Sequence, residues 1–388
     1  MELTKCKLGE LITQRREKND GSDLPICGVS KDGLIPPKQK DADTSIYNVF
    51  YRDDFIFNPA RMELNSIAIN DMYDRAICSS LYEVFYVHRT DLLLPHYLEL
   101  IIRQKWFTRY CEFLGQGSAR EYCRFGNISE IEIEFPPIEE QQKIVEYNTA
   151  IENRIALKQK INDNLVACID TIFNEQFGNF KALAESSTAN TDFSSLPDGW
   201  TIENAVHSFD ISIGKTPPRS EPEWFTSNQT DNVWISIADM KTNSPFIFKS
   251  AEYLTNEAVK KHNVKIVPAN SVLLSFKMTV GRVAIVTNEV TTNEAIAHFP
   301  CTKENLFFVY CYLKNFNYGY LGSTSSITTA INSKIIKEMP FLMPSKKELD
   351  LFNHKVSGLF EQLKYISKEL DILEELSKML LPQLLGHC

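Results

Sequence analysis

The tripeptide Gly214-Lys215-Thr216 has the residue types that close a phosphate-binding loop. That loop needs the spacing G-x-x-x-x-G-K-[ST], because its glycines let backbone N–H groups surround the phosphates. Phe209 stands where the first glycine is required, so we expect no nucleotide site. Two interpretations stay open: an ordinary turn before Pro217-Pro218, or a segment in which Lys215, Thr216 and Arg219 approach phosphate.

Other catalytic signatures are missing from the sequence. It contains no G-x-S-x-G nucleophile motif, no H-E-x-x-H zinc motif and no glycine-rich dinucleotide fingerprint after a strand. Asn58-Pro59-Ala60-Arg61 matches only the start of the Asn/Asp-Pro-Pro-aromatic motif of amino-methyltransferases. The nine cysteines form no CxxC pair and the seven histidines do not cluster with them. We therefore expect no catalysis, no metal and no cofactor in this chain.

Length and composition indicate a soluble protein of several domains. The 388 residues suggest two to four units at roughly 100–200 residues each. No uncharged apolar run approaches the ~18 residues of a membrane span, and the first five residues lack the apolar core of a signal peptide. We expect a cytoplasmic protein with no membrane partner. The net charge of −9 excludes a surface coated in basic residues, so any contact with nucleic acid must come from local patches.

The segment 345–388 predicts a long helix with one apolar seam. Steps of three and four reach Leu349, Phe352, Val356, Leu359, Leu363, Ile366, Leu370, Leu373, Ser377, Leu380 and Leu384. Ten of these eleven residues are apolar, which is the pattern of a coiled-coil seam. Ser345 and Glu348 form a capping box at the start, and we expect Pro382 to end the helix.

A second long helix is predicted about 207 residues earlier, over 137–178, with Gly178 as its C-cap. Its stripe is Ile144, Asn148, Ile151, Ile155, Lys158, Asn162, Leu165, Ile169 and Ile172. Three polar residues on the stripe could fix the register of a partner helix. The simplest partner for each helix is the other one, in an antiparallel pair. The alternative is two unrelated core helices.

A mixed globular segment precedes each helix. Strand patterns at 54–57 and 66–69 have counterparts at 271–276 and 282–286, and helical patterns follow at 95–102 and 305–313. The polar stretch over 179–195, between the first long helix and the second globular segment, predicts a linker. The expected organisation is α+β: a domain over 1–136, a helix over 137–178, a linker over 179–195, a domain over 196–344 and a helix over 345–388.

Several short motifs follow one another along the two halves of the chain. They are Phe57-Asn58-Pro59-Ala60-Arg61, Ser80-Leu81-Tyr82-Glu83-Val84-Phe85, Pro136-Pro137-Ile138-Glu139-Glu140-Gln141-Gln142-Lys143-Ile144, Leu196-Pro197-Asp198-Gly199-Trp200, Gly214-Lys215-Thr216-Pro217, Val233-Trp234-Ile235-Ser236-Ile237-Ala238-Asp239-Met240, residues 272–284 and Thr292-Asn293-Glu294-Ala295-Ile296. These motifs and the order of the elements resemble the specificity subunit of type I restriction-modification systems, and the resemblance covers nearly the whole chain. Lys347-Glu348, Met278 and Glu294 stand where the family often has Glu-Gln, glycine and glutamine.

The resemblance implies two globular α+β target recognition domains and two long helices that form an antiparallel coiled coil. Each domain would read one half of a bipartite, asymmetric double-stranded DNA site, and the helices would set the gap and bind methyltransferase subunits. Two methyltransferase subunits are expected, with restriction subunits as further partners. S-adenosylmethionine, ATP and Mg would belong to those partners. The alternative functions are a coiled-coil scaffold without a DNA role and an enzyme with its own active site.

Residues that could contact DNA carry cations or hydroxyl groups. In the first domain they are Arg61, Arg103, Lys105, Arg109, Arg120 and Arg124; in the second they are Lys215, Thr216, Arg219, Lys241, Lys277, Arg282, Ser323, Thr324 and Ser325. The alternative for each is a solvated charge or an ordinary turn. Arg61 and Lys277 carry the most weight, because each lies beside the central β turn of its domain.

Overall fold

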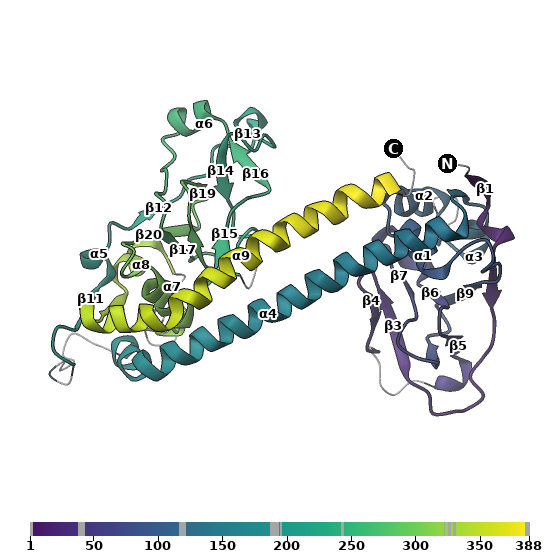
Figure 1. The fold of residues 1–388 in the computed structure, drawn as a ribbon, viewed down its shortest axis with the longest axis horizontal. Helices are drawn as coiled ribbons and strands as arrows, with labels where there is room; N and C mark the ends of the chain where they lie inside the picture. The colour runs from purple at the N-terminus through teal and green to yellow at the C-terminus, as the bar shows by residue number, and fades with distance from the viewer. Residues whose placement is uncertain are drawn as a thin grey trace. The chain divides into compact units, whose positions relative to one another are not determined.

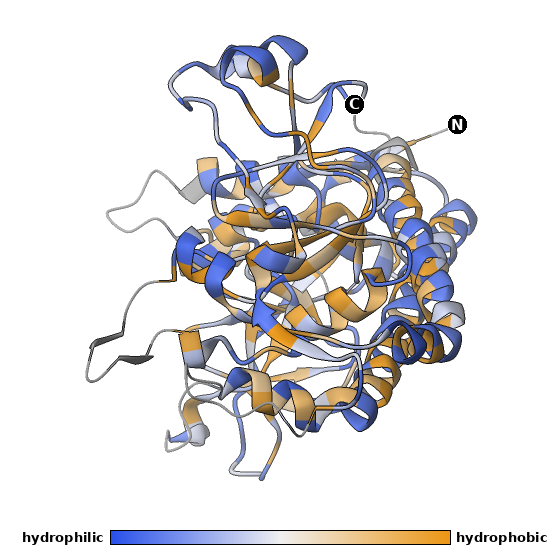
Figure 2. Cartoon of the chain, turned by 90° about the vertical axis from the view of Figure 1, so that its left-hand side faces the viewer, coloured by the Kyte–Doolittle hydropathy of each residue, from blue (hydrophilic) through white to orange (hydrophobic). Residues whose placement is uncertain are grey.

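The computed structural model describes residues 3–37, 43–115, 122–186, 194, 196–241, 244–321, 323–324, 327–328 and 331–384. The chain divides into two compact units (Figure 1). Unit 1 comprises Met1–Arg154 and Leu373–Cys388, and unit 2 comprises Ile155–Ile372. Hydrophobic residues concentrate on the strands and on the inner faces of the helices, as Figure 2 shows. Among the described residues, no helix is long and apolar enough to cross a membrane.

Unit 1 contains two four-stranded sheets. One has the order β2 (Ile12–Arg15), β9 (Glu83–Val87), β6 (Phe55–Phe57), β7 (Ile67–Ile69); the other has the order β4 (Gly33–Ile35), β3 (Ile26–Ser30), β8 (Arg75–Cys78), β5 (Asn48–Tyr51). Strand β1 (Thr4–Lys7) pairs antiparallel with β10 (Glu132–Phe135). The helices are η1 (Leu8–Glu10), η2 (Thr44–Ile46), η3 (Pro59–Leu64), α1 (Pro95–Ile102), α2 (Lys105–Gly115) and α3 (Phe125–Ser129).

Unit 2 contains a five-stranded and a four-stranded sheet. The first has the order β12 (Ser212–Ile213), β20 (Ile296–Pro300), β17 (Ser271–Ser275), β18 (Val283–Val286), β15 (Phe246–Ile247). The second has the order β13 (Phe225–Thr226), β16 (Glu252–Leu254), β14 (Asn232–Ile235), β19 (Thr291–Thr292). Two pairs complete the strands: β11 (Thr201–Asn204) with β23 (Pro340–Met343), and β21 (Ser323–Thr324) with β22 (Ile327–Thr328). The helices are α5 (Ala205–Ser208), η4 (Pro222–Trp224), α6 (Asn256–Lys261), α7 (Leu306–Asn315), η5 (Tyr318–Leu321) and α8 (Ser333–Glu338).

The two units repeat one plan, as the strand and helix patterns predict. The order β2-β9-β6-β7 in unit 1 corresponds to β12-β20-β17-β18 in unit 2. In each unit the first strand pairs with the last, and a helix follows the central hairpin at the predicted place, α1 in unit 1 and α7 in unit 2. The predicted α+β fold class is confirmed.

The long helices are α4 (Ile138–Glu185) and α9 (Lys346–Leu384). They run antiparallel where they meet. In unit 2, the Gln176 side chain contacts Glu348, and Lys158 pairs with Glu369 at 2.7 Å. In unit 1, the Ser377 hydroxyl lies 3.4 Å from Glu152 Oε1. Later residues of α9 therefore meet earlier residues of α4, which confirms the antiparallel arrangement.

The predicted seam of α9 is buried. Leu349, Phe352, Val356, Leu363, Ile366 and Leu373 are buried, and Leu359, Leu370 and Leu380 are partly buried. Phe360, which the three-four steps passed over, is also buried. On α4, Ile144 packs in the core of unit 1, Leu165 and Ile172 lie at the edge of the core of unit 2, and Ile151 and Ile155 are half-buried.

Two predicted helix ends were wrong. Gly178 lies inside α4, which runs to Glu185, because residues beyond the glycine still bury apolar surface: Phe180 packs on Trp200, with ring centroids 4.7 Å apart. That packing offsets the roughly 1 kcal/mol that glycine costs inside a helix. Residues 179–185, assigned to the linker, are therefore helical. Pro382 lies in the last turn of α9, where its missing N–H costs one hydrogen bond without ending the helix.

Candidate nucleic-acid interface

The segment Gly214-Lys215-Thr216 lies against the loop that follows β19. The backbone N–H of Lys215 donates to the Thr292 carbonyl at 2.9 Å. A Cβ on Gly214 would lie 2.1 Å from the Asn293 carbonyl oxygen, so only glycine fits this approach. The glycine therefore serves the close packing of two loops, and the approach of Lys215, Thr216 and Arg219 to phosphate stays a prediction.

Polar side chains gather around Glu294 at this edge of unit 2. The Thr216 hydroxyl donates to the Glu294 carboxylate. Burial raises the pKa of Glu294, but the Thr216 hydrogen bond and the charges of Lys277 and Arg219 outweigh it, so the pKa lies below its ordinary value. Three of the residues predicted to contact DNA are therefore brought together around one carboxylate.

Arg219 is held in a fixed orientation. Its guanidinium donates to both carboxylate oxygens of Glu252, at 2.6 and 2.8 Å. It also lies over the rings of Phe225 and Trp234, at 4.0 and 4.8 Å from their centroids. The hydrogen bonds to Glu252 are the largest cause of the raised pKa of Arg219. Paired and stacked, the guanidinium loses little further freedom on binding a ligand.

The remaining cations of unit 2 differ in their surroundings. Lys277 is exposed on the connection between β17 and β18. Arg282, at the other end of that connection, is half-buried and donates to the Ile237 carbonyl at 2.7 Å. Lys241 is exposed after β14. Arg282 therefore joins the hairpin to the neighbouring loop, while Lys277 and Lys241 reach solvent.

In unit 1, Arg61 occupies the place that corresponds to Lys277. It is exposed on η3, the connection between β6 and β7. Helix α2 packs against η3 and carries exposed Lys105 and Arg109. The amide of Asn65 links the two elements by donating to Thr108 Oγ1 at 2.8 Å. The fold thus places three predicted cations on two adjoining elements.

Arg103 and Arg124 make contacts within unit 1. The Arg103 guanidinium donates to the carbonyl oxygens of Lys31 and Ile67, at 2.9 and 3.0 Å. Arg124, just before α3, lies 3.3 Å from Glu83 and over the ring of Tyr122. These contacts give Arg103 a structural role, and its contact with DNA stays a prediction.

The side chains of three predicted hydroxyl residues and one predicted cation lie outside the described part of the chain. Arg120 and Ser325 lie outside the described residues. Ser323 and Thr324 form strand β21, of which only the backbone is described. Their contact with DNA stays a prediction.

A buried histidine that the sequence analysis missed supports this edge of unit 2. His298 Nδ1 lies 2.9 Å from the Ser212 hydroxyl, and Nε2 lies 2.7 Å from the Thr292 hydroxyl. Burial and, secondarily, the charge of Lys265 lower the pKa of His298 to about 4. The neutral ring therefore ties β12 and β20 to Thr292, whose carbonyl holds Lys215.

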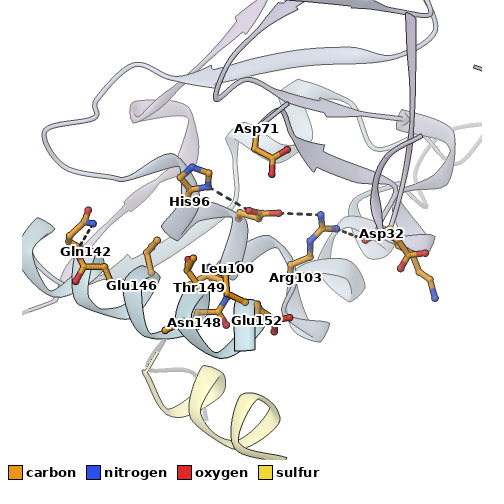
Figure 3. A pocket seen from close by; sticks show the side chains of 15 residues that line it. Asp32, Asp71, His96, Leu100, Arg103, Gln142, Glu146, Asn148, Thr149 and Glu152 are labelled. Carbon is orange, nitrogen blue, oxygen red and sulfur yellow. Dashed lines mark hydrogen bonds and ion pairs between the residues drawn. The ribbon is translucent and has the colours of Figure 1, made fainter. Parts of the chain in front are cut away.

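A large hollow in unit 1, of about 980 Å³, lies between α1 and the first turns of α4 (Figure 3). His96 lies 3.8 Å from both Asp53 and Glu99 there, and its pKa is raised, chiefly by Glu99. The acidic residues that line it are Asp32, Asp71, Glu99, Glu146 and Glu152. Its basic residues are Lys31, Arg103 and His96. This acidic surface is unsuited to DNA phosphates. Among the described residues no group of three or more His, Cys, Asp or Glu side chains could hold a metal ion.

Comparison with known proteins places this arrangement in a family. The model of the type I restriction modification DNA specificity domain matches residues 6–167 and 208–378. The HindI specificity subunit of Haemophilus influenzae is 23% identical over 360 residues, covering 76% of this chain and 78% of that protein. The MjaIX specificity subunit of Methanocaldococcus jannaschii is 22% identical over 306 residues, covering 76% and 69%.

A solved structure shares the fold. The crystal structure of the type I restriction-modification S subunit from M. genitalium superposes with a TM-score of 0.57 at 14% identity, covering 99% of this chain and 96% of that one. The family model matches both halves of the repeat, and each match spans one α+β segment with most of its long helix. The chain therefore belongs to the type I restriction-modification DNA specificity family, as a DNA sequence-recognition subunit.

Proposed function

We propose that unit 1 and unit 2 each recognise one half of a bipartite DNA sequence, and that the chain itself is non-catalytic. The observation that carries this proposal is that the two units share one strand order but differ in the elements beside their central hairpins. Each unit presents a cation on its central hairpin connection, Arg61 in one and Lys277 in the other. Beside these cations the units diverge: between α1 and α3 stands helix α2, whereas between α7 and α8 stand η5 and the β21–β22 pair. Different surfaces on one scaffold suit two different half-sites.

The helices α4 and α9 are proposed to set the gap between the half-sites. A helix advances about 1.5 Å per residue, so a seven-residue insertion that keeps the seam in phase lengthens the pair by about 10.5 Å. At about 3.4 Å per base pair this corresponds to about three additional base pairs in the gap. The insertion would be made in both helices to preserve their register.

Methylome sequencing tests the proposal. Hosts carrying the methyltransferase partner with wild-type chain, with the insertion variant, or without the chain are compared. We expect a split motif that depends on the chain and a gap about three base pairs longer in the variant. The same insertion within residues 187–193, which the sequence assigns to the linker, should leave the gap unchanged. An unchanged gap in the helix variant contradicts the spacer role, and no chain-dependent motif contradicts the recognition role.

The outer faces of the helices support docking of methyltransferase subunits. Leu157 and Ile161 are exposed four residues apart on α4, and Tyr365 and Ile372 are exposed seven residues apart on α9. These spacings place each pair on one helix face, where a partner helix could cover it. Two such subunits per chain, matching the repeat, would carry S-adenosylmethionine, and restriction subunits would carry ATP and Mg.

The distribution of charge supports the proposal that this chain and the methyltransferase bind DNA together. The net charge is −9, and cations at both edges are paired with carboxylates, such as Arg219 with Glu252 and Arg124 with Glu83. Paired cations contribute little non-specific attraction to phosphates. We expect weak DNA binding by the isolated chain and tight binding with the methyltransferase. A titration showing tight, specific binding by the chain alone contradicts this division of labour.

A further inference from the structure

The connection between β17 and β18 exposes apolar side chains to solvent. Met278 is 98% exposed and Val280 is 38% exposed. Of the large apolar side chains that the structure describes, Met278 is the most exposed. Leaving such surface in water gives the folded chain no stability. Packing within unit 2 therefore provides no reason for a methionine at this position.

The backbone at Met278 is also unfavourable for a residue with a side chain. Its φ is +57°. The N–H of Thr279 donates to the Lys277 carbonyl at 2.6 Å, which closes a γ-turn centred on Met278. A γ-turn with positive φ is rare and strained, and glycine adopts it at less steric cost. Strain that the surrounding structure maintains is a pointer to function.

The surrounding hydrogen bonds hold the turn in place. The Ser275 hydroxyl donates to the Thr279 carbonyl at 2.6 Å and accepts from the N–H of Arg282 at 3.0 Å. The N–H of Gly281 donates to the Ser275 carbonyl at 2.9 Å, and the Tyr318 ring packs against Gly281. The methionine is thus presented from a fixed turn.

Lysine and arginine side chains, together with the Glu294 carboxylate, lie on the turn and on the segment that contacts Glu294. Lys277 precedes Met278 and is exposed, and both Lys277 and Arg219 act on the charge of Glu294. Lys215 is exposed on the adjoining segment. Methionine and arginine are enriched in protein–protein interfaces, but lysine is depleted there, whereas lysine beside an inserted apolar side chain is typical of proteins that wedge DNA. The charge around Met278 therefore favours DNA as its ligand over a protein.

We propose that Met278 inserts between two stacked base pairs of the half-site recognised by unit 2, an inference that rests on the proposed DNA recognition. Lys277 and Lys215 bind the phosphates on either side of the opened base step. An unbranched, polarizable thioether adapts to the irregular gap between unstacked bases. Pyrimidine–purine steps unstack most easily, so the wedge favours a TA or CA/TG step at one position of this half-site.

The test uses the full chain in complex with its methyltransferase partner and cognate duplexes that carry 2-aminopurine at successive positions. Wild-type complex should raise the fluorescence at one step of the second half-site. Met278→Asn, which tolerates positive φ, should abolish that rise and weaken cognate binding at least tenfold. Met278→Leu, which keeps an apolar side chain, should retain both properties. The control Met72→Asn changes a methionine of unit 1 that is 61% exposed, and it should leave the step unaffected.

The outcomes separate this inference from the proposed function. Sequence-specific binding by wild type without a local fluorescence rise, together with unchanged binding by Met278→Asn, overturns the wedge and leaves DNA recognition standing. No sequence preference in the wild-type complex overturns both. Loss of methyltransferase association in Met278→Asn makes the turn a protein contact and overturns the wedge. Met278→Asn should unfold at the same temperature as wild type, so that its loss of binding does not arise from misfolding, and Met278→Gly should unfold at that temperature or higher.

Discussion

Protonation of His298 should destabilise unit 2. The ring is fully buried on β20, between the hydroxyl groups of Ser212 and Thr292. Because the Thr292 hydroxyl can donate to the Asn293 carbonyl, it is suited to accept from Nε2–H, which leaves Nδ1 to accept from Ser212. The neutral ring satisfies both contacts. An added proton brings an uncompensated charge into the core.

The magnitude follows from the two pKa values. Burial lowers the folded-state pKa to about 4, whereas an unfolded histidine titrates near 6.5. As pH falls the unfolded state takes up the proton first, so this stability is complete above about pH 6.5 and is lost as the pH falls from there toward 4. The full difference corresponds to about 3 kcal/mol, of which about 2 kcal/mol is lost between pH 7 and pH 5.

Urea unfolding at pH 7 and pH 5 measures this loss. Trp200, Trp224 and Trp234 all belong to unit 2, so tryptophan fluorescence reports mainly on that unit. His298→Gln removes the titrating ring, and its free energy of unfolding should fall by about 2 kcal/mol less than that of wild type between the two pH values. The control His354→Gln, at an exposed position on α9, should keep the wild-type difference. Equal losses in wild type and His298→Gln refute the reasoning.

Three further substitutions test the packing and the docking surface. Phe352→Ala empties a fully buried position of the α9 seam and should lower the free energy of unfolding by about 3–5 kcal/mol in urea titrations, with Phe352→Leu losing clearly less. Arg15→Met leaves the buried Asp54 carboxylate without its ion pair and should cost about 3–5 kcal/mol, whereas adding Asp54→Asn should restore most of that loss. Tyr365→Ser with Ile372→Ser changes exposed residues and should alter stability by less than about 1 kcal/mol, yet weaken methyltransferase binding in calorimetric titrations. Methyltransferase binding by that double variant as tight as that of wild type contradicts docking on this face.

The helices could be predicted where burial follows a local period. On α9 one face stays buried over many turns, so steps of three and four found Phe352, Val356 and Leu363. On α4 the predicted stripe reached Ile172, but the buried positions there are Phe173 and Phe177. A straight helix has 3.6 residues per turn, and its buried face drifts from a strict 3.5-residue repeat. Toward its end α4 packs into a globular core with Trp200, so its buried residues there no longer follow a regular repeat in the sequence.

The candidate site could be predicted where a residue lies beside its own turn. Arg61 and Lys277 were placed correctly on the central hairpin connections, because adjacent strand patterns locate the turn between them. The contacts of Arg103 within unit 1 could not be predicted, because its partners Lys31 and Ile67 lie 72 and 36 residues away in the sequence. The pairing of Arg219 with Glu252 spans 33 residues for the same reason. Contacts between residues that are far apart in the sequence follow no fixed spacing, so a sequence pattern cannot predict them.

The carboxylates at the edge of unit 2 explain how an acidic chain can serve a DNA-recognition family. Glu252 holds Arg219 against Trp234, and Glu294 holds Thr216 close to Lys277. Each carboxylate reduces the general attraction of its cation for phosphate while it fixes the position of the donor. A donor fixed in advance loses less entropy on contact with the correct base and cannot readily shift to an incorrect one. If methyltransferase partners supply the attraction to DNA, as proposed, the acidic residues among these cations would lower non-specific affinity and raise discrimination between bases.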